Sequence, residues 1–116
     1  MQRMPLDDKQ LGNVGNLKLE MRRGAIVLAV LSRLGTEQYG YSLKRALADK
    51  GLQIDEGTLY PLLRRLESQG LLESSWRLED ARPRRYYHLS KRGADTLAEL
   101  RSDWIELGNA MRRLLS

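Results

Sequence analysis

The spacing of apolar and polar residues divides the chain into an irregular start and a series of periodic segments. Residues 1–16 mix proline, glycine, asparagine and charged residues without a sustained pattern. This composition predicts a flexible arm with room for one short helical turn. From Leu17 to Leu34 the sequence becomes apolar on nearly all sides after Arg23, a pattern typical of a buried helix in a compact core.

Two further helices are predicted, each followed by a glycine of the kind that ends helices. The first runs from about Tyr39 to Lys50 before Gly51, and its inward-facing residues are Leu43, Ala46 and Leu47. The next runs from Asp55 to Gln69, and Asp55 suits the N-cap position because its carboxylate can accept from a free backbone amide. Its buried stripe is formed by leucines at helical spacing: Leu59, Leu62, Leu63 and Leu66.

The remaining pattern predicts a β-hairpin and a long last helix. Residues 71–78 alternate as a half-buried strand does, with one face formed by Leu72, Ser74, Trp76 and Leu78. Residues 84–90 are rich in strand formers, 79–83 form the connection, and Ser90 caps a helix from Lys91 to about Leu115. The order predicts a mainly α fold with a small β-hairpin: a winged helix-turn-helix over residues 17–90, followed by a C-terminal dimerisation helix over 91–116.

Composition narrows the classes of function. The 116 residues are 41% hydrophobic, which suits one small domain that self-association would help to stabilise. The chain has no cysteine and one histidine, His88, so we expect no disulfide, no metal site and no cofactor. Its apolar runs fall far short of the roughly 20 residues that cross a bilayer, which predicts a soluble cytoplasmic protein. The net charge of +5 permits a polyanionic partner without identifying one.

The third predicted helix contains Pro61, which removes one helical hydrogen bond at a cost of about 3 kcal/mol in a helix interior. If the leucines face inward, the opposite face carries Gly57, Tyr60, Pro61, Arg64 and Ser68. On that face the proline ring offers an outward apolar surface that suits thymine methyls or sugars. Tyr60 can reach a phosphate, and Arg64 can bind guanine or phosphate. Thr58 can donate to a phosphate at the helix N-terminus. The alternative is a kinked surface helix on which Tyr60 packs against a neighbour.

Three stretches of the sequence resemble the PadR-type transcriptional regulators: YGYSLKRAL, GTLYPLLRRLESQGLLES and RPRRYYHLSKRG, within about residues 19–110. The resemblance implies a dimeric, ligand-responsive winged-helix repressor of the short subfamily, which has a single C-terminal helix. It places Thr58, Tyr60, Pro61 and Arg64 on the recognition helix. It also places Tyr41 and Lys44 on the supporting helix, beside the phosphate backbone.

The predicted hairpin carries Arg82, Arg84 and Arg85 around Pro83, and a hairpin tip beside the recognition helix would lie over the flanking minor groove. The alternative is a solvated turn whose charge is balanced by the neighbouring acids, Glu79 and Asp80. The aromatic residues of the hairpin, Trp76, Tyr86 and Tyr87, are interpreted as packing residues. His88 is interpreted as a strand residue with an ordinary hydrogen bond.

The last helix repeats apolar residues with alternating steps of three and four, as a heptad interface does: Leu97, Leu100, Trp104, Leu107, Met111 and Leu114. This pattern favours a two-fold homodimer, with recognition helices about 34 Å apart and a pseudopalindromic DNA site. The alternative is that the helix folds back on the first helix of its own chain. In the dimer interpretation, Trp104 is a large hydrophobic anchor of the interface. The resemblance adds that Trp104 and Met111 line a pocket for an aromatic small-molecule effector.

These observations favour a sequence-specific DNA-binding regulator, a dimeric repressor that releases duplex DNA on a signal. The runner-up is a winged-helix protein-interaction module whose basic hairpin binds an acidic partner. Enzymatic activity is the weakest of the three, because the sequence has no paired acid–base residues, phosphate-binding glycine loop or metal-ligand cluster.

Overall fold

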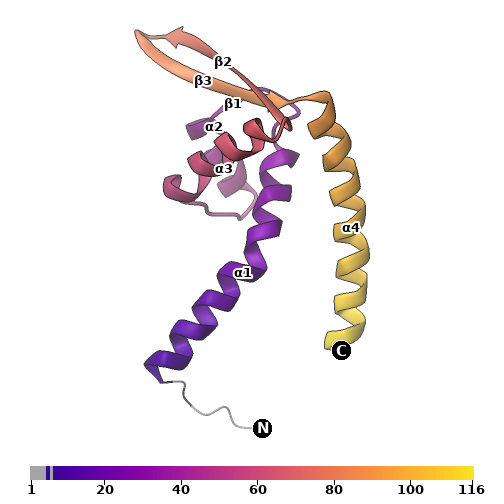
Figure 1. Ribbon diagram of the computed structural model, residues 1–116. Helices are drawn as coiled ribbons and strands as arrows, with labels where there is room; N and C mark the ends of the chain where they lie inside the picture. Colours follow the sequence, from indigo (N-terminus) through magenta and orange to yellow (C-terminus); the bar gives the residue numbers. More distant parts are fainter. Residues whose placement is uncertain (1–4, 6) are drawn as a thin grey trace.

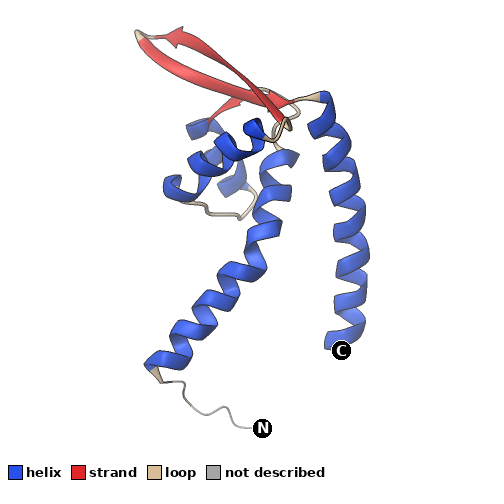
Figure 2. Ribbon diagram, viewed as in Figure 1, coloured by secondary structure: helices blue, strands red, loops and turns tan. Residues whose placement is uncertain are grey.

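The computed structural model describes residue 5 and residues 7–116, which form four helices and a small antiparallel sheet (Figures 1 and 2). The sheet caps one end of the helices, and α1 and α4 both extend from the body on the side away from the hairpin (Figure 1). The elements are α1 (Asp8–Ser32), β1 (Gln38–Tyr39), α2 (Gly40–Asp49), α3 (Glu56–Ser68), β2 (Leu72–Glu79), β3 (Arg82–Leu89) and α4 (Lys91–Leu115). This arrangement is a winged helix-turn-helix with one added C-terminal helix, as the hydrophobic pattern predicted.

The start of the chain departs from the prediction, because α1 already begins at Asp8. Asp7 caps this helix: its carboxylate accepts from the Gln10 amide at 2.8 Å, and the Gln10 side chain accepts from the Asp7 amide at 2.9 Å. This reciprocal pair stabilises a helix start that the glycines and asparagines downstream obscure. The expected flexible arm over residues 1–16 is therefore wrong for residues 8–16. Its residues 1–4 and 6 lie outside the described residues.

The expectation that the first helix is buried holds only for its C-terminal end. Val30 and Leu31 are fully buried, whereas the preceding turns carry leucines and a methionine that are more than half exposed. The reason is geometric: a helix of 25 residues extends well beyond the body against which its last turns pack. The exposed residues are Leu11, Leu17, Leu19 and Met21.

The core lies between the end of α1, α2, α3 and the base of the hairpin. The predicted leucine stripe of α3 is buried in full, and Leu43 and Leu47 of α2 face it. Leu72 and Tyr87 close the core from the hairpin. These residues hold α3 so that its opposite face is left to solvent.

The sheet has three strands in the order β1-β3-β2, all antiparallel. Strand β1, which pairs Gln38 with Tyr87 and Tyr39 with Tyr86, was not predicted, because two residues are too few to show an alternating pattern. The predicted connection over 79–83 shrinks to Asp80 and Ala81, both with positive φ (50° and 60°). Two such residues form the tight turn that matches the twist of a hairpin.

Helix α4 begins where predicted, and Ser90 caps it by accepting from the Gly93 amide at 3.0 Å. A Cβ at Gly93 would lie 1.9 Å from the carbonyl oxygen of Leu71, so only glycine allows this close contact. The Ser90 hydroxyl also donates to the Gly70 carbonyl at 2.6 Å. These contacts fix the direction in which α4 leaves the hairpin.

Candidate nucleic-acid interface

The N-terminus of α3 is open to solvent and well ordered by its cap. Asp55 accepts from the Thr58 amide at 2.7 Å, and hydrogen bonding by the Thr58 side chain and amide holds the pKa of Asp55 below its ordinary value. Gly57 and Thr58 are both exposed. Pro61 cannot donate to the Gly57 carbonyl one turn earlier, and because that carbonyl belongs to an exposed residue, solvent or a partner can satisfy it.

The outward face of α3 is as predicted. Every residue of the stripe is exposed, and in the described part of the chain Arg64 forms no salt bridge. An exposed guanidinium without an internal partner is free to bind an external anion. The stripe consists of Gly57, Tyr60, Pro61, Arg64 and Ser68.

Tyr60 combines the two predicted roles. A Cβ at Gly40 would lie 2.4 Å from Cε1 of Tyr60, so the ring packs directly on the start of α2, and a larger residue at position 40 would have to displace it. The side chain nevertheless stays 37% exposed. Tyr60 therefore joins α2 to α3 and still presents part of its ring to the outside.

The two predicted residues of α2 lie beside the start of α3. Tyr41 is exposed, stacks at 6.4 Å on Tyr39 and has the Arg45 guanidinium 6.0 Å from its ring centroid. Lys44 lies 3.9 Å from Glu56 in the first turn of α3. That ion pair is largely exposed, so it leaves the ammonium available to a stronger anion.

The three arginines of the hairpin, grouped by the sequence, differ in their surroundings. Arg82 is exposed and forms no salt bridge among the described residues. Arg84 donates to Glu79 at 3.1 Å and lies 4.7 Å above the Tyr39 ring. Glu79 therefore balances the charge of Arg84, as expected in the alternative interpretation of the hairpin tip as a solvated turn.

Arg85 belongs to a closed ring of three polar side chains. Its guanidinium donates to Glu67 of α3 at 2.5 Å and to the Ser74 hydroxyl of β2 at 3.0 Å. The Ser74 hydroxyl in turn donates to the second carboxylate oxygen of Glu67. All three are partly buried, so the ring joins α3 to both strands of the hairpin and occupies much of the hydrogen-bonding capacity of Arg85.

The outer face of the hairpin carries a second polar network. Tyr86 donates to Glu79 at 2.7 Å, and this bond raises the pKa of Tyr86 and lowers the pKa of Glu79. Arg77 lies 4.4 Å above the Tyr86 ring and pairs with Glu37. These contacts stiffen the strands where they leave the body.

Trp76 is the residue whose place the sequence failed to predict. It is 66% exposed, and Leu78 beyond it is 75% exposed, although both continue the face on which Leu72 is buried. The strands extend past the edge of the body, so no core covers the distal half of this face (Figure 2). The expected half-buried strand is therefore realised only at its base. An alternating pattern of apolar and polar residues does not indicate how far along the strand the core covers the apolar face.

His88 has the ordinary role predicted for a strand residue, with Nε2 3.0 Å from Glu73 across the strand pair. No cluster of three potential metal ligands occurs among the described residues. Within the same part of the chain, each helix is too short or too polar to cross a bilayer.

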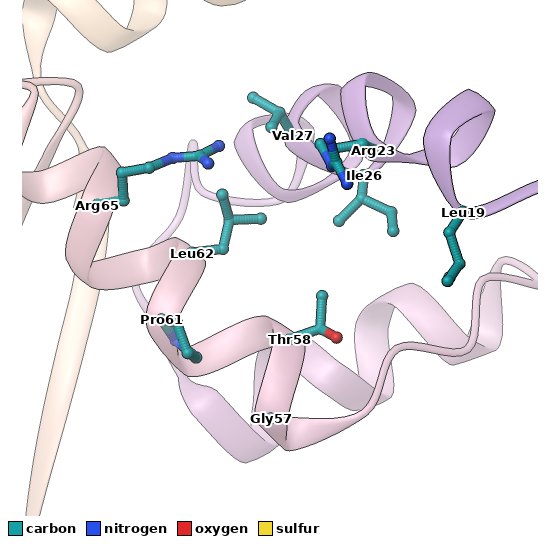
Figure 3. A pocket seen from close by; sticks show the side chains of 9 residues that line it. All are labelled: Leu19, Arg23, Ile26, Val27, Gly57, Thr58, Pro61, Leu62 and Arg65. Atoms are coloured by element: carbon teal, nitrogen blue, oxygen red, sulfur yellow. The ribbon is translucent and has the colours of Figure 1, made fainter. Parts of the chain in front are cut away.

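A groove of about 460 Å³ separates α1 from the first turns of α3 (Figure 3). Ile26 and Leu62 point toward each other across it, while Thr58 and Pro61 form the side that belongs to α3. Arg23 and Arg65 add two guanidinium groups to its lining. The flank of α3 that faces α1, with Thr58, Pro61 and Arg65, is thus only partly covered by its own chain.

The heptad residues of α4 fall into two groups. Leu97 and Leu100 are half-buried against the core of the same chain, so the fold-back alternative describes this part of the helix. The remaining four are exposed: Trp104 (52%), Leu107 (53%), Met111 (41%) and Leu114 (73%).

These features define a class of protein, a winged helix-turn-helix module in which the outward face of α3 is exposed beside an arginine-rich hairpin. Residues 27–99 match the model of the Transcriptional regulator PadR-like family. The chain belongs to the PadR-like family of transcriptional regulators, as its sequence motifs indicated.

Individual relatives agree with this assignment. The chain is 39% identical over 89 residues to Transcriptional regulator Rv3488 of Mycobacterium tuberculosis. The matched region covers 76% of this chain and 83% of the relative. A PadR family transcriptional regulator from Eggerthella lenta has 45% identity and a TM-score of 0.81, covering 90% of this chain and 94% of the other. A PadR-like transcription factor from Bacteroides fragilis has 34% identity and a TM-score of 0.73, with coverages of 85% and 98%.

Proposed function

We propose that this PadR-like regulator binds a pseudopalindromic duplex as a homodimer, with α3 in the major groove and the hairpin over the flanking minor groove. The observation that carries the proposal is the outward face of α3, where Arg64 is exposed and without an internal ion pair among the described residues. Tyr60, Pro61 and Thr58 lie on or beside the same face. Such a face can combine a bidentate arginine contact with apolar contact to thymine methyls.

The supporting contacts to phosphate come from neighbouring elements. Tyr41 and Lys44 of α2 approach the backbone on one side, while Arg82 and the hairpin approach it on the other. Arg82 is the freest of the three hairpin arginines, so it contributes most to phosphate binding, whereas Arg84 and Arg85 first stabilise the hairpin itself.

Dimerisation uses the exposed apolar residues of α4. Four large side chains over about three turns cannot remain in water without cost, and the same helix of a second chain offers the matching surface. The exposed apolar residues of α1 give a partner chain a second apolar surface to cover. A two-fold axis between the helices then presents two copies of α3 about one turn of B-DNA apart.

We further propose that the dimer acts as a repressor and that an aromatic small molecule relieves repression at the dimer interface. Trp104 supplies a flat surface for stacking. Met111, about two turns further along the same face of the helix, supplies an adaptable wall. A ligand there changes the separation of the two recognition helices, which couples ligand binding to DNA affinity. Unchanged operator affinity across a broad panel of aromatic compounds would count against this step.

Selection from random duplex DNA at near-physiological salt tests the core of the proposal. We expect an inverted repeat with half-sites one helical turn apart. Replacing Arg64 by Ala should cost about 1–3 kcal/mol on that site and relax base preference at one position of each half-site. Enrichment of no sequence, together with tight binding of an acidic protein, would instead favour a protein-interaction module.

A further inference from the structure

The distal half of the hairpin presents an apolar surface that faces the recognition helix. Trp76 and Leu78 alternate on β2, and the strand register pairs Leu78 with Pro83 and Trp76 with Arg85. Alternation places them on the face whose base, at Leu72, is buried in the core. We call Trp76, Leu78 and Pro83, all exposed, the inner wing face.

This face adjoins the recognition helix directly. Trp76 and Pro83 line a groove of about 320 Å³ whose other side includes Tyr60 and Arg64 of α3. A single extended ligand lying in this groove would therefore touch the outward face of α3 and the inner wing face together.

The indole of Trp76 lies beside a guanidinium that is itself held by hydrogen bonds. The guanidinium of Arg85 lies 5.7 Å from the Trp76 ring, and Glu67 and Ser74 fix that guanidinium by hydrogen bonds. Arg85 is therefore a positioning residue: it orients the tryptophan and joins the wing to α3. An exposed but oriented aromatic ring suits a binding surface better than a disordered one does, because less conformational entropy is lost on binding.

We propose that the inner wing face packs on the deoxyribose rings of the DNA strand that passes between α3 and the wing. This inference rests on the proposed function. A deoxyribose presents C–H groups between two phosphates, so its matching surface is an apolar patch with a cation on each side. Trp76, Leu78 and Pro83 form the patch; Arg64 lines the same groove as Trp76 and Pro83, and Arg82 lines a neighbouring groove that Pro83 shares. An apolar peptide would match the patch but not these two arginines, which have no salt-bridge partner in the described part of the chain.

The contact has two distinctive properties. It is independent of base sequence, because every nucleotide carries the same sugar. It also releases no counterions, because Trp76 carries no charge, so its loss should leave the salt dependence of binding unchanged.

The test compares wild-type protein with Trp76→Ala, Trp76→Phe and Ser75→Ala on the selected duplex and on an unrelated duplex. Ser75 is the exposed neighbour on the opposite face of the same strand and serves as the matched control. We expect Trp76→Ala to weaken binding to both duplexes by about tenfold or more, with the slope of log K against log salt unchanged. Trp76→Phe should recover part of the loss, and Ser75→Ala should bind as wild type does.

Fluorescence supplies an independent readout. The difference in emission between wild type and Trp76→Phe isolates Trp76 from Trp104, and it should shift when DNA is added. Since Trp76 is 66% exposed, its replacement should leave the melting temperature unchanged, which separates lost contact from lost folding.

Several results would overturn the inference. Unchanged affinity of Trp76→Ala together with unmoved Trp76 emission would exclude the contact, and a loss confined to one base sequence would show that the ring reads bases. A lower sedimenting mass of free Trp76→Ala would show that the face binds a second chain. If wild-type protein binds no duplex, it is the proposed function that fails.

Discussion

The winged-helix body and the projecting ends of α1 and α4 all carry large apolar residues, yet only the body covers its own. In the body, the leucines of α3 are between 0% and 8% exposed. In the projecting ends, Leu17 of α1 and Trp104 and Leu107 of α4 are all at least half exposed. The structure therefore separates a part whose apolar residues one chain covers from a part whose apolar residues stay exposed in that chain.

The largest effect should come from the body. Leu63 is fully buried, and Leu63→Ala is expected to destabilise the fold by about 2–5 kcal/mol, since it removes apolar contacts and leaves a cavity. Chemical denaturation measures this change. Leu115→Ala, at an 82% exposed position in the projecting end of α4, is the matched control and should leave the free energy of unfolding nearly unchanged. Equal losses in both variants would erase the distinction between the two regions.

A charge in the projecting end should separate assembly from folding. Leu107→Asp is expected to give a folded monomer, because the site is 53% exposed within one chain, whereas in the proposed dimer a second chain would bury the new charge. Sedimentation velocity measures the mass and circular dichroism the helix content. Affinity for an inverted repeat should fall by about a hundredfold, because two half-sites are no longer bound together. A dimer that persists in this variant would place the interface elsewhere.

Smaller differences should distinguish arginines within the hairpin. Arg82→Ala is expected to reduce the slope of log K against log salt by about 1, because one phosphate contact is lost. Arg85→Ala should weaken binding without that change in slope. Glu67→Gln gives a test of sign: removing a negative charge beside DNA should strengthen binding by electrostatics alone, whereas loss of the ring with Ser74 and Arg85 should weaken it. Tighter binding by Glu67→Gln would show that the ring does not position the wing.

The smallest effect concerns the cap of α3 and depends on pH. The pKa of Asp55 is lowered from 3.8 by hydrogen bonding to Thr58, so its stabilising contribution is present above the unfolded-state pKa. That contribution is lost as the pH falls through the lower, folded-state pKa. The difference in unfolding free energy between wild type and Asp55→Ala should accordingly be constant near neutral pH and shrink in acid. A difference that grows in acid would contradict the assigned cap.

Periodicity predicted the parts of the molecule in which local pattern and burial agree. The leucine stripe of α3, its Asp55 cap and the Ser90 start of α4 all followed from short-range sequence rules. The start of α1 did not, because the capping pair of Asp7 and Gln10 precedes a stretch with weak helix formers.

The candidate site was predictable in its residue types more than in its contacts. The exposed face of α3 follows directly from the position of its leucines. The hydrogen bond from Arg85 to Glu67 could not be predicted in this way, because the two residues are 18 positions apart in the sequence. The exposure of Trp76 depends on how far the hairpin extends past the body, a tertiary quantity that alternation cannot report.

The most direct test of the central claim is the mass of the protein–DNA complex, measured by sedimentation equilibrium on a selected duplex and on a duplex with one half-site. We predict two chains bound to the full inverted repeat, and much weaker binding to the half-site. One chain bound to each duplex, with the same affinity for both, would contradict the proposal that the projecting helices assemble the DNA-binding unit.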